Sequence, residues 1–155
     1  MRIALIAVGR LGRAPEAALV LDYVQRATAA GRVLGLGPVD LIEVDSRKPG
    51  KSAEAQAVGA HLTEADHLIA CDEHGAARPS RDFAERLSVI RDRGVRRLAL
   101  LIGGPDGLDA SLLERADERL AFGPQTWPHA LARVMLAEQV YRGITILAGG
   151  PYHRD

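Results

Sequence analysis

Apolar positions follow two different periods along the chain. Continuous apolar runs bounded by polar or glycine residues are typical of strands buried on both faces of a sheet. These runs predict strands at residues 2–9, 39–45, 66–75, 96–104 and 120–123. Apolar residues at helical spacing predict helices between them, at residues 15–31, 52–65, 80–94, 109–120 and 129–147. Since strands and helices alternate throughout, we expect a parallel α/β sandwich.

Residues that are favoured at helix termini support two of these helices. Pro15 stands at the start of the first helix and Gly31 at its end, as their backbone preferences favour. Ser80 is expected to cap the N-terminus of the third helix.

Length and composition favour a single soluble domain over residues 1–155. The chain is 47% apolar and 26% charged, which argues against disorder. Lys plus Arg and Asp plus Glu number 20 each, so net charge gives no argument for nucleic acid. Basic clusters at residues 10–13 and 91–97, and a basic loop before residue 52, leave local phosphate contact open. Solvated surface is the ordinary interpretation of such clusters.

The single cysteine, Cys71, excludes an internal disulfide and fits a reducing cytoplasm. The apolar run at the N-terminus is too short for a membrane span and lacks a signal-peptide cleavage pattern. The five histidines lack a recognisable ligand spacing, which argues against a metal site. We therefore expect a cytoplasmic protein without a membrane or a metal.

Three predicted strands end in glycine-bearing or polar loops, at Gly9, residues 71–75 and residues 103–107. Ligands of open α/β sheets bind outside the carboxyl ends of strands, so the site is expected there. The sequence "IGGPDG" is not the dinucleotide fingerprint and lacks the lysine of a phosphate-binding loop. A structural turn and a ligand loop both remain open.

A second candidate loop, "FGPQTWPH", immediately precedes the last helix. Pro124 and Pro128 stiffen it, and an extended rigid segment could offer backbone groups to a heterocycle. The alternative is an ordinary helix entry, with Thr126 as the cap and Trp127 packed in the core.

The last helix carries two pairs of chemically interesting residues. His129 and Arg133 share one face, and Glu138 and Arg142 lie roughly opposite, where a surface salt bridge is the plain interpretation. The apolar residues between them exceed what one surface helix needs, which indicates a dimer interface; they are Leu131, Val134, Met135, Val140, Tyr141, Ile144 and Leu147.

The tail "GGPYHRD" places an aromatic ring, an imidazole and a guanidinium together. Tyr152, His153 and Arg154 suit an RNA base and its phosphates. The alternative is an ordinary mobile terminus.

Three stretches, "RIALIAVGR", "LLIGGPDGL" and "WPHALARVMLAEQVYRGITILAGGPYHRD", resemble the RlmH family of SPOUT-class methyltransferases. The resemblance covers essentially the whole chain. It implies methylation of N3 of a pseudouridine in helix 69 of 23S rRNA, on the assembled 70S ribosome. It also implies a parallel-sheet SPOUT fold with helices on both faces, a C-terminal trefoil knot, and a homodimer packed through the last helix.

The resemblance further implies that S-adenosylmethionine (SAM) is held by the knot loops. Carried over by position, the SAM contacts are Cys71, Gly104, Gly123, Pro124, Gln125, Thr126, Trp127 and Pro128. Gly103 and Gly104 would leave room for the cofactor and for a close backbone crossing. The chain departs from the family at Cys71, where a larger apolar residue is usual, and at Trp127, where Phe or Leu is commoner.

Methylation of the weakly acidic N3–H of a pseudouridine requires loss of its proton at or before attack. The candidates are His129 as base or relay, and Arg133, Arg142 and His153 as phosphate or carbonyl clamps. Tyr152 could stack on a flipped base, in its own or in the partner's site. Two rivals remain: a nucleotide- or flavin-binding α/β enzyme, and a ribosome-binding factor without catalysis.

Overall fold

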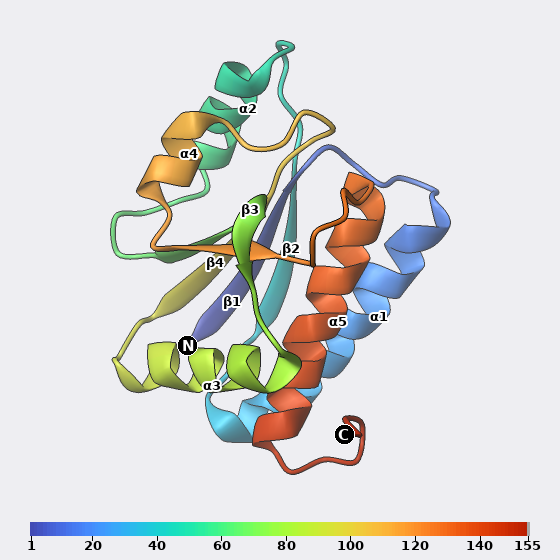
Figure 1. Ribbon diagram of the computed structural model, residues 1–155, viewed down its shortest axis with the longest axis vertical. Helices are drawn as coiled ribbons and strands as arrows, with labels where there is room; N and C mark the ends of the chain where they lie inside the picture. Colours follow the sequence, from blue (N-terminus) through green and yellow to red (C-terminus); the bar gives the residue numbers. More distant parts are fainter. Residues whose placement is uncertain (155) are drawn as a thin grey trace.

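The computed structural model describes residues 1–154 and contains one sheet of five strands, all parallel, in the order β2-β1-β4-β3-β5 (Figure 1). The strands are β1 (Arg2–Val8), β2 (Val39–Val44), β3 (His67–Ala77), β4 (Arg97–Ile102) and β5 (Glu118–Ala121). The helices are α1 (Pro15–Gly31), α2 (Lys51–Gly59), α3 (Ser80–Asp92), α4 (Ala110–Arg115) and α5 (His129–Leu147), with a short 3-10 turn over Arg32–Leu34.

Successive residues of the central strands point to opposite faces of the sheet, and both faces are buried. Ile3 and Leu5 of β1 belong to one apolar core, while Ala4 and Ile6 belong to the other. Helices α1, α3 and α5 cover the first face, and α2 and α4 cover the second (Figure 1). The predicted parallel α/β sheet with helices on both faces is therefore confirmed. No helix within residues 1–154 is long and apolar enough to cross a membrane.

The predicted boundary between the fourth helix and the fifth strand is wrong. Helix α4 ends at Arg115, and β5 begins at Glu118, inside the segment predicted as helix. Glu118 pairs with Ile69 of β3, and its carboxylate accepts hydrogen bonds from Arg86 at 2.7 Å and Arg78 at 3.1 Å. These long-range contacts outweigh the local helix preference of the segment.

Ser80 does not cap helix α3, contrary to the prediction. Pro79 occupies the cap position and makes no side-chain cap bond, while Ser80 is the first helical residue. The Ser80 hydroxyl instead donates to Oε1 of Gln139 on α5, at 2.8 Å. It thus ties the start of α3 to α5.

Strand β3 continues to Ala77, beyond the polar loop predicted at residues 71–75. Its pairing with β5 shifts register between Cys71 and Ala76, which marks a bulge. Gly75 lies in this bulge, where a Cβ atom would come within 2.6 Å of the Leu120 backbone nitrogen. Only glycine allows the two strands to approach so closely.

Candidate functional site

A cavity of about 720 Å³ lies at the carboxyl ends of β3, β4 and β5. Its walls come from residues 71–74 of β3, residues 103–108 after β4, and residues 120–129 around the end of β5. The predicted SAM contacts Cys71, Gly104, Gly123, Gln125, Thr126, Trp127 and Pro128 all line it. Pro124 lies between two lining residues. The loop after β1, expected at this site, is not among the lining residues.

The glycine loop after β4 is both a tight turn and a wall of the cavity. Gly107 has a φ of +78° and donates its amide proton to the Gly104 carbonyl oxygen at 3.0 Å. A Cβ atom on Gly103 would lie 2.4 Å from the carbonyl carbon of Gly107. The turn can close only with glycine at position 103. The outer surface of the turn borders the cavity.

Two side-chain hydrogen bonds hold the loop between β5 and α5. The indole nitrogen of Trp127 donates to the Phe122 carbonyl oxygen at 3.1 Å, and the Thr126 hydroxyl donates to Glu73 at 3.2 Å. Pro128 is the residue before α5, so Thr126 is not its cap, and Trp127 is 41% exposed rather than in the core. The interpretation of this segment as an ordinary helix entry is therefore wrong in both details.

Carboxylates predominate among the charged groups around the cavity. Asp72, Glu73 and Asp106 line it, against a single lysine, Lys51. Oδ2 of Asp72 is buried without a hydrogen bond, because the nearest cation, Arg119, is 3.6 Å away. Such an oxygen can accept a hydrogen bond from a ligand hydroxyl or ammonium. Sequence reasoning missed these acids, although Asp72 and Glu73 directly follow a buried strand run.

His129 is the first residue of α5 and lines the same cavity. Its imidazole has no hydrogen bond or ion pair to any side chain or backbone group within residues 1–154, which leaves both ring nitrogens available to a ligand. The residue can therefore exchange a proton with a molecule bound beside it.

Arg133, one helical turn further along α5, is completely buried. Its guanidinium donates to Glu43 at 2.6 Å and to the carbonyl oxygens of Val8 at 3.0 Å and Gly9 at 3.2 Å. Burial lowers the pKa of Arg133, and the Glu43 carboxylate opposes that shift. Arg133 thus fastens the start of α5 to the ends of β1 and β2.

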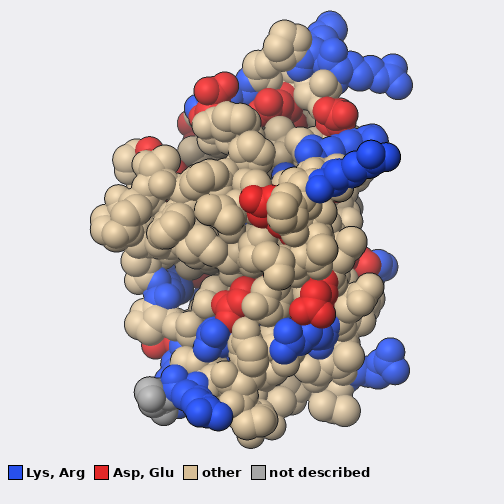
Figure 2. All heavy atoms as spheres, turned by 90° about the vertical axis from the view of Figure 1, so that its right-hand side faces the viewer, with Lys and Arg blue, Asp and Glu red and all other residues tan. Residues whose placement is uncertain are grey.

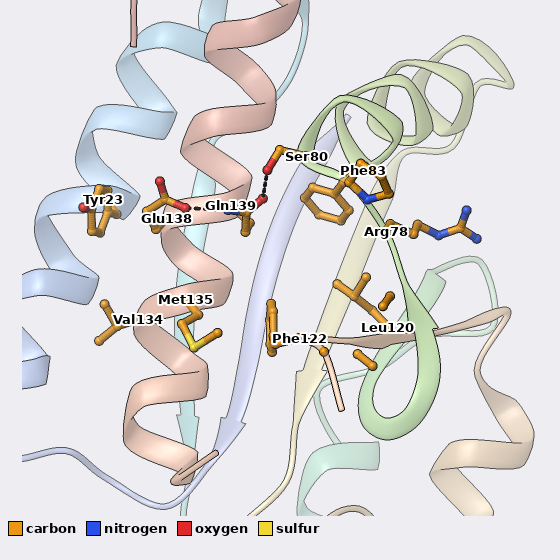
Figure 3. Close-up of a pocket in the computed structure, with 14 residues that line it drawn as sticks. Tyr23, Arg78, Ser80, Phe83, Leu120, Phe122, Val134, Met135, Glu138 and Gln139 are labelled. Atoms are coloured by element: carbon orange, nitrogen blue, oxygen red, sulfur yellow. Dashed lines mark hydrogen bonds between the residues drawn. The ribbon is translucent and has the colours of Figure 1, made fainter. Parts of the chain in front are cut away.

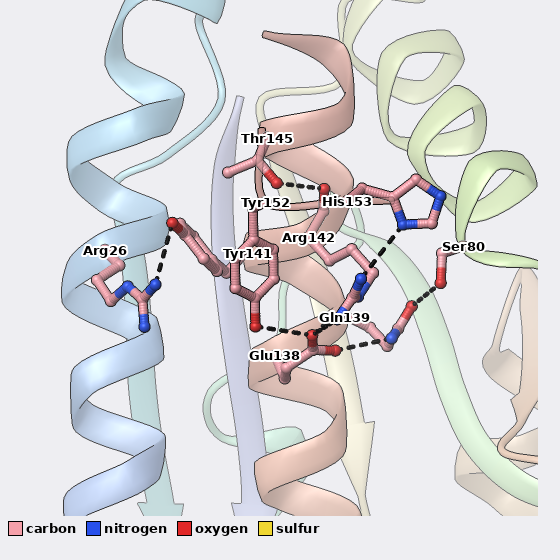
Figure 4. Close-up of polar contacts among 9 residues, drawn as sticks. All are labelled: Arg26, Ser80, Glu138, Gln139, Tyr141, Arg142, Thr145, Tyr152 and His153. Carbon is pink, nitrogen blue, oxygen red and sulfur yellow. Dashed lines mark hydrogen bonds and ion pairs between the residues drawn. The ribbon is translucent and has the colours of Figure 1, made fainter. Parts of the chain in front are cut away.

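The described part of the tail packs against α5 rather than extending into solvent (Figure 4). Oε1 of Glu138 accepts from Arg142 Nε at 2.8 Å and from the Tyr152 hydroxyl at 3.1 Å. Arg142 also lies 3.2 Å from Nδ1 of His153, and the Tyr152 ring packs 4.7 Å from that of Tyr141. Burial, followed by hydrogen bonding, raises the pKa of Tyr152.

These contacts decide against an ordinary mobile tail for residues 152–153. Glu138 and Arg142 form the predicted ion pair, which is part of this cluster rather than an isolated surface pair. Arg154 is exposed, and Asp155, the last residue of the motif, lies outside the described residues.

The predicted catalytic residues therefore form two groups within one chain. His129 lines the cavity, whereas Arg142, Tyr152 and His153 cluster around Glu138. Nine residues of α5 separate His129 from Glu138, a rise of about 14 Å along the helix. The described end of the tail lies near the end of α5 that is farther from His129 (Figure 1). Within residues 1–154, a single chain does not bring the tail to the cavity.

A second cavity, of about 520 Å³, lies between α5, α3 and the end of β5 (Figure 3). Val134, Met135 and Phe83 give it apolar walls, and Glu138 and Gln139 stand at its edge. It shares residues 120–123 with the first cavity, so one short segment separates the two.

The apolar residues of α5 form two stripes along the helix, one buried and one partly exposed. Leu136, Val140 and Ile144 are completely buried in the core of the same chain, so Val140 and Ile144 are not available to a partner. Leu131 is 41% exposed, and Val134 and Met135 are partly exposed beside the second cavity. The second stripe remains uncovered in the single chain.

Two solved structures share this fold. A probable methyltransferase from Bordetella pertussis superposes with a TM-score of 0.55 at 16% identity, covering 92% of this chain and 96% of that one. A probable methylase family protein from Haemophilus influenzae gives 0.52 at 15% identity, covering 99% and 70%. At such low identity these likenesses support the fold alone.

Sequence comparison is more specific. The family described as a predicted SPOUT methyltransferase matches residues 1–153. The ribosomal RNA large subunit methyltransferase H of Phenylobacterium zucineum is 68% identical over 155 residues, covering all of both chains. The protein of the same name from Ruegeria pomeroyi is 50% identical and covers 99% of both. The chain therefore belongs to the SPOUT methyltransferases and, within them, to the family of ribosomal RNA large subunit methyltransferase H, as its motifs predicted.

Proposed function

We propose that the protein is a SAM-dependent methyltransferase that methylates N3 of a pseudouridine in helix 69 of 23S rRNA, on the assembled 70S ribosome. The observation that carries the proposal is the 720 Å³ cavity, in which seven predicted SAM contacts meet His129. The names of the full-length relatives supply the rRNA substrate. Such a substrate also locates the reaction in the cytoplasm.

The cavity fits a cationic nucleoside better than an anionic one. Its volume is ordinary for a small-molecule site, and Ile102, Leu120 and Phe122 give it apolar surface for an adenine ring. The excess of carboxylates over Lys51 suits a sulfonium and an ammonium, whereas NAD or a flavin nucleotide would bring phosphates into it. Oδ2 of Asp72, which has an ion pair with Arg119 but no hydrogen bond, could accept one from a ribose hydroxyl.

The bound cofactor supplies an electrophilic methyl group. In the proposed mechanism, His129 takes the proton from N3 of the base, which frees the N3 lone pair for the methyl group that SAM, held by residues 103–108 and 122–128, would supply. The walls of the cavity hold the two reactants in line. We expect His129→Gln to lower kcat by about 10²–10⁴, the usual range for a general base, with unchanged SAM affinity.

We assign Arg133 a positioning role in place of the predicted clamp, because it is completely buried and both terminal nitrogens of its guanidinium donate to Glu43 and two carbonyl oxygens, while its Nε has no hydrogen bond. Arg142 and His153 remain candidate clamps, and Tyr152 remains the candidate stacking ring. Because these three residues lie far from His129 within one chain, we propose that in a homodimer they contribute to the cavity of the partner.

The proposed dimer packs through the uncovered stripe of α5, which contains Leu131, Val134 and Met135. This stripe borders the second cavity and Glu138, to which the tail is attached. A partner seated there would lie beside residues 120–123, the segment common to both cavities.

The C-terminal trefoil knot is also a proposal. The support for it is the close backbone approach at Gly75, where β5 passes against the bulge of β3 just before the chain enters the loop at residues 122–128. Glycine is the residue that permits such a close approach of two backbone segments.

The first test is a calorimetric titration of the purified protein with SAM, NAD and FMN. Micromolar binding of SAM alone would support the methyltransferase, whereas preference for NAD or FMN would favour the nucleotide-binding enzyme. Transfer of labelled methyl groups is then measured on ribosomes lacking the modification and on a free helix 69 hairpin. We expect turnover on ribosomes and little on the hairpin. Ribosome binding without methyl transfer would favour a scaffold factor.

A further inference from the structure

Two loops rich in cations lie side by side at the carboxyl edge of the sheet. The first follows β1 and contains Arg10 and Arg13; the second follows β2, contains Arg47 and Lys48, and leads to Lys51, the first residue of α2. Val8 pairs with Val44 at the ends of the two strands, and the Gly9 amide donates to the Val44 carbonyl oxygen at 2.8 Å. The two loops therefore leave the sheet as neighbours. We name these five cationic residues the basic edge.

The charges of the basic edge are accessible and largely uncompensated. All five side chains are exposed, and Asp45 is the only carboxylate in the two loops. Asp45 pairs with Arg10 at 3.7 Å, and both groups are well exposed, so this ion pair is weak. Within residues 1–154 the other four form no ion pair within 4 Å, although Lys51 interacts electrostatically with Asp109. Figure 2, which shows the molecule from the right-hand side of Figure 1, has Lys and Arg side chains projecting in its upper part.

The basic edge adjoins the cofactor cavity. Lys51 belongs to both, since it opens α2 and lines the cavity. A Cβ atom on Gly104, in the glycine loop of the cavity, would lie within 3.4 Å of Val8 and 3.5 Å of Glu54. The ends of β1 and α2 thus pack against the cavity wall itself. A polyanion lying along the basic edge would pass the mouth of the site.

We propose that the basic edge binds the sugar-phosphate backbone of the substrate RNA and thereby positions it over the cavity. The inference rests on the proposed function, since it takes ribosomal RNA as the partner. It also accounts for RNA binding by a chain with equal numbers of acidic and basic residues, because the free positive charge is concentrated beside the site. Arginine and lysine contacts of this kind position a nucleic acid without reading its sequence.

The test is the salt dependence of binding to vacant 70S ribosomes, measured by co-sedimentation. The triple variant R13Q/R47Q/K48Q leaves Lys51 in the cavity wall intact. R32Q/R93Q/R96Q is the matched control, because it removes three exposed charges at the amino ends of the strands. Melting curves and SAM titrations establish that both variants are folded with an intact cavity.

We expect the slope of log affinity against log salt to fall by about one for each phosphate contact that the first variant removes, with roughly tenfold weaker binding at low salt. The control should keep the wild-type slope. Equal slopes in the first variant and the wild type, or equally weakened binding in both variants, would overturn the proposal. Methyl transfer is scored separately: a wild-type protein that binds with this salt dependence but transfers no methyl group would refute the proposed function and leave the basic edge as an RNA-binding surface.

Discussion

At the scale of single residues, the start of α5 depends on the ion pair between the completely buried Arg133 and the partly buried Glu43, which also accepts from the Leu11 amide at 2.9 Å. Removing one member leaves the other without its partner, which costs about 3 kcal/mol for buried pairs. We expect Arg133→Met to lower the free energy of unfolding by about this amount, measured by urea denaturation.

The double variant R133M/E43Q is the control for this prediction. It removes the stranded carboxylate charge and should recover part of the lost stability, so that the two substitutions are not additive. Additive effects would show that Arg133 stabilises the protein through packing alone.

Cys71 predicts a pH dependence of stability. Burial raises the pKa of its thiol from 9.0 to about 12, so the folded chain retains the proton longer than the unfolded chain. The resulting stabilisation is complete below pH 9 and is lost as the pH rises toward 12. Urea denaturation of the wild type and Cys71→Ala between pH 8 and 11 measures it. Parallel pH profiles of the two proteins would contradict this assignment.

At the residue scale, the sequence predicted which loops lie at the ends of the strands, whereas the roles of the residues in those loops stay predictions. Gly104, Gly123 and Trp127 could be placed at the cavity because they follow predicted strands. The partner of Arg133 could not be predicted, because Glu43 lies 90 positions away and meets it only through the fold.

At the scale of elements, α5 and the tail act as one unit, joined through Glu138. Deleting residues 152–155 should abolish methylation and leave SAM affinity nearly intact, because the tail lies away from the cavity of its own chain. Tyr152→Phe is the matched control, since it keeps the ring and removes only the hydroxyl group, and it should retain most of the turnover. A decrease in SAM affinity as large as the decrease in turnover would exclude this division of labour.

Among the elements, helices and central strands could be predicted from periodicity, but the end of α4 and the start of β5 could not. Glu118 and Arg119 have side chains compatible with a helix, and only their pairing with β3 makes them a strand. The bulge in β3 has the same origin, because its register is set by β5 and not by the sequence around Gly75.

At the scale of the whole molecule, self-association is the property that would complete the site. We expect Leu131→Glu to weaken the proposed homodimer at least about tenfold, since it places a charge on the uncovered stripe of α5. Sedimentation velocity over a range of concentrations measures the change. Val33→Glu is the control, because Val33 is 87% exposed and lies on the short turn after α1. A Leu131→Glu variant that still forms a stable dimer would show that the interface lies on another surface.

The strand order could not be predicted at this scale. The alternation of elements indicates a parallel sheet but does not determine the order of its strands. Strand β4 lies between β1 and β3, and these pairings join residues far apart along the chain. The family resemblance, carried by the glycine loop and the C-terminal motif, implied a SPOUT fold but gave no strand order.

The close approach at Gly75 has a consequence for how this sequence can evolve. Any side chain there would push β5 away from β3, and the segment that follows β5 walls both cavities. A substitution at this one position would therefore displace a wall that both cavities share. In a saturation scan scored by activity, position 75 would rank with the chemically reactive positions, although glycine has no functional group to contribute.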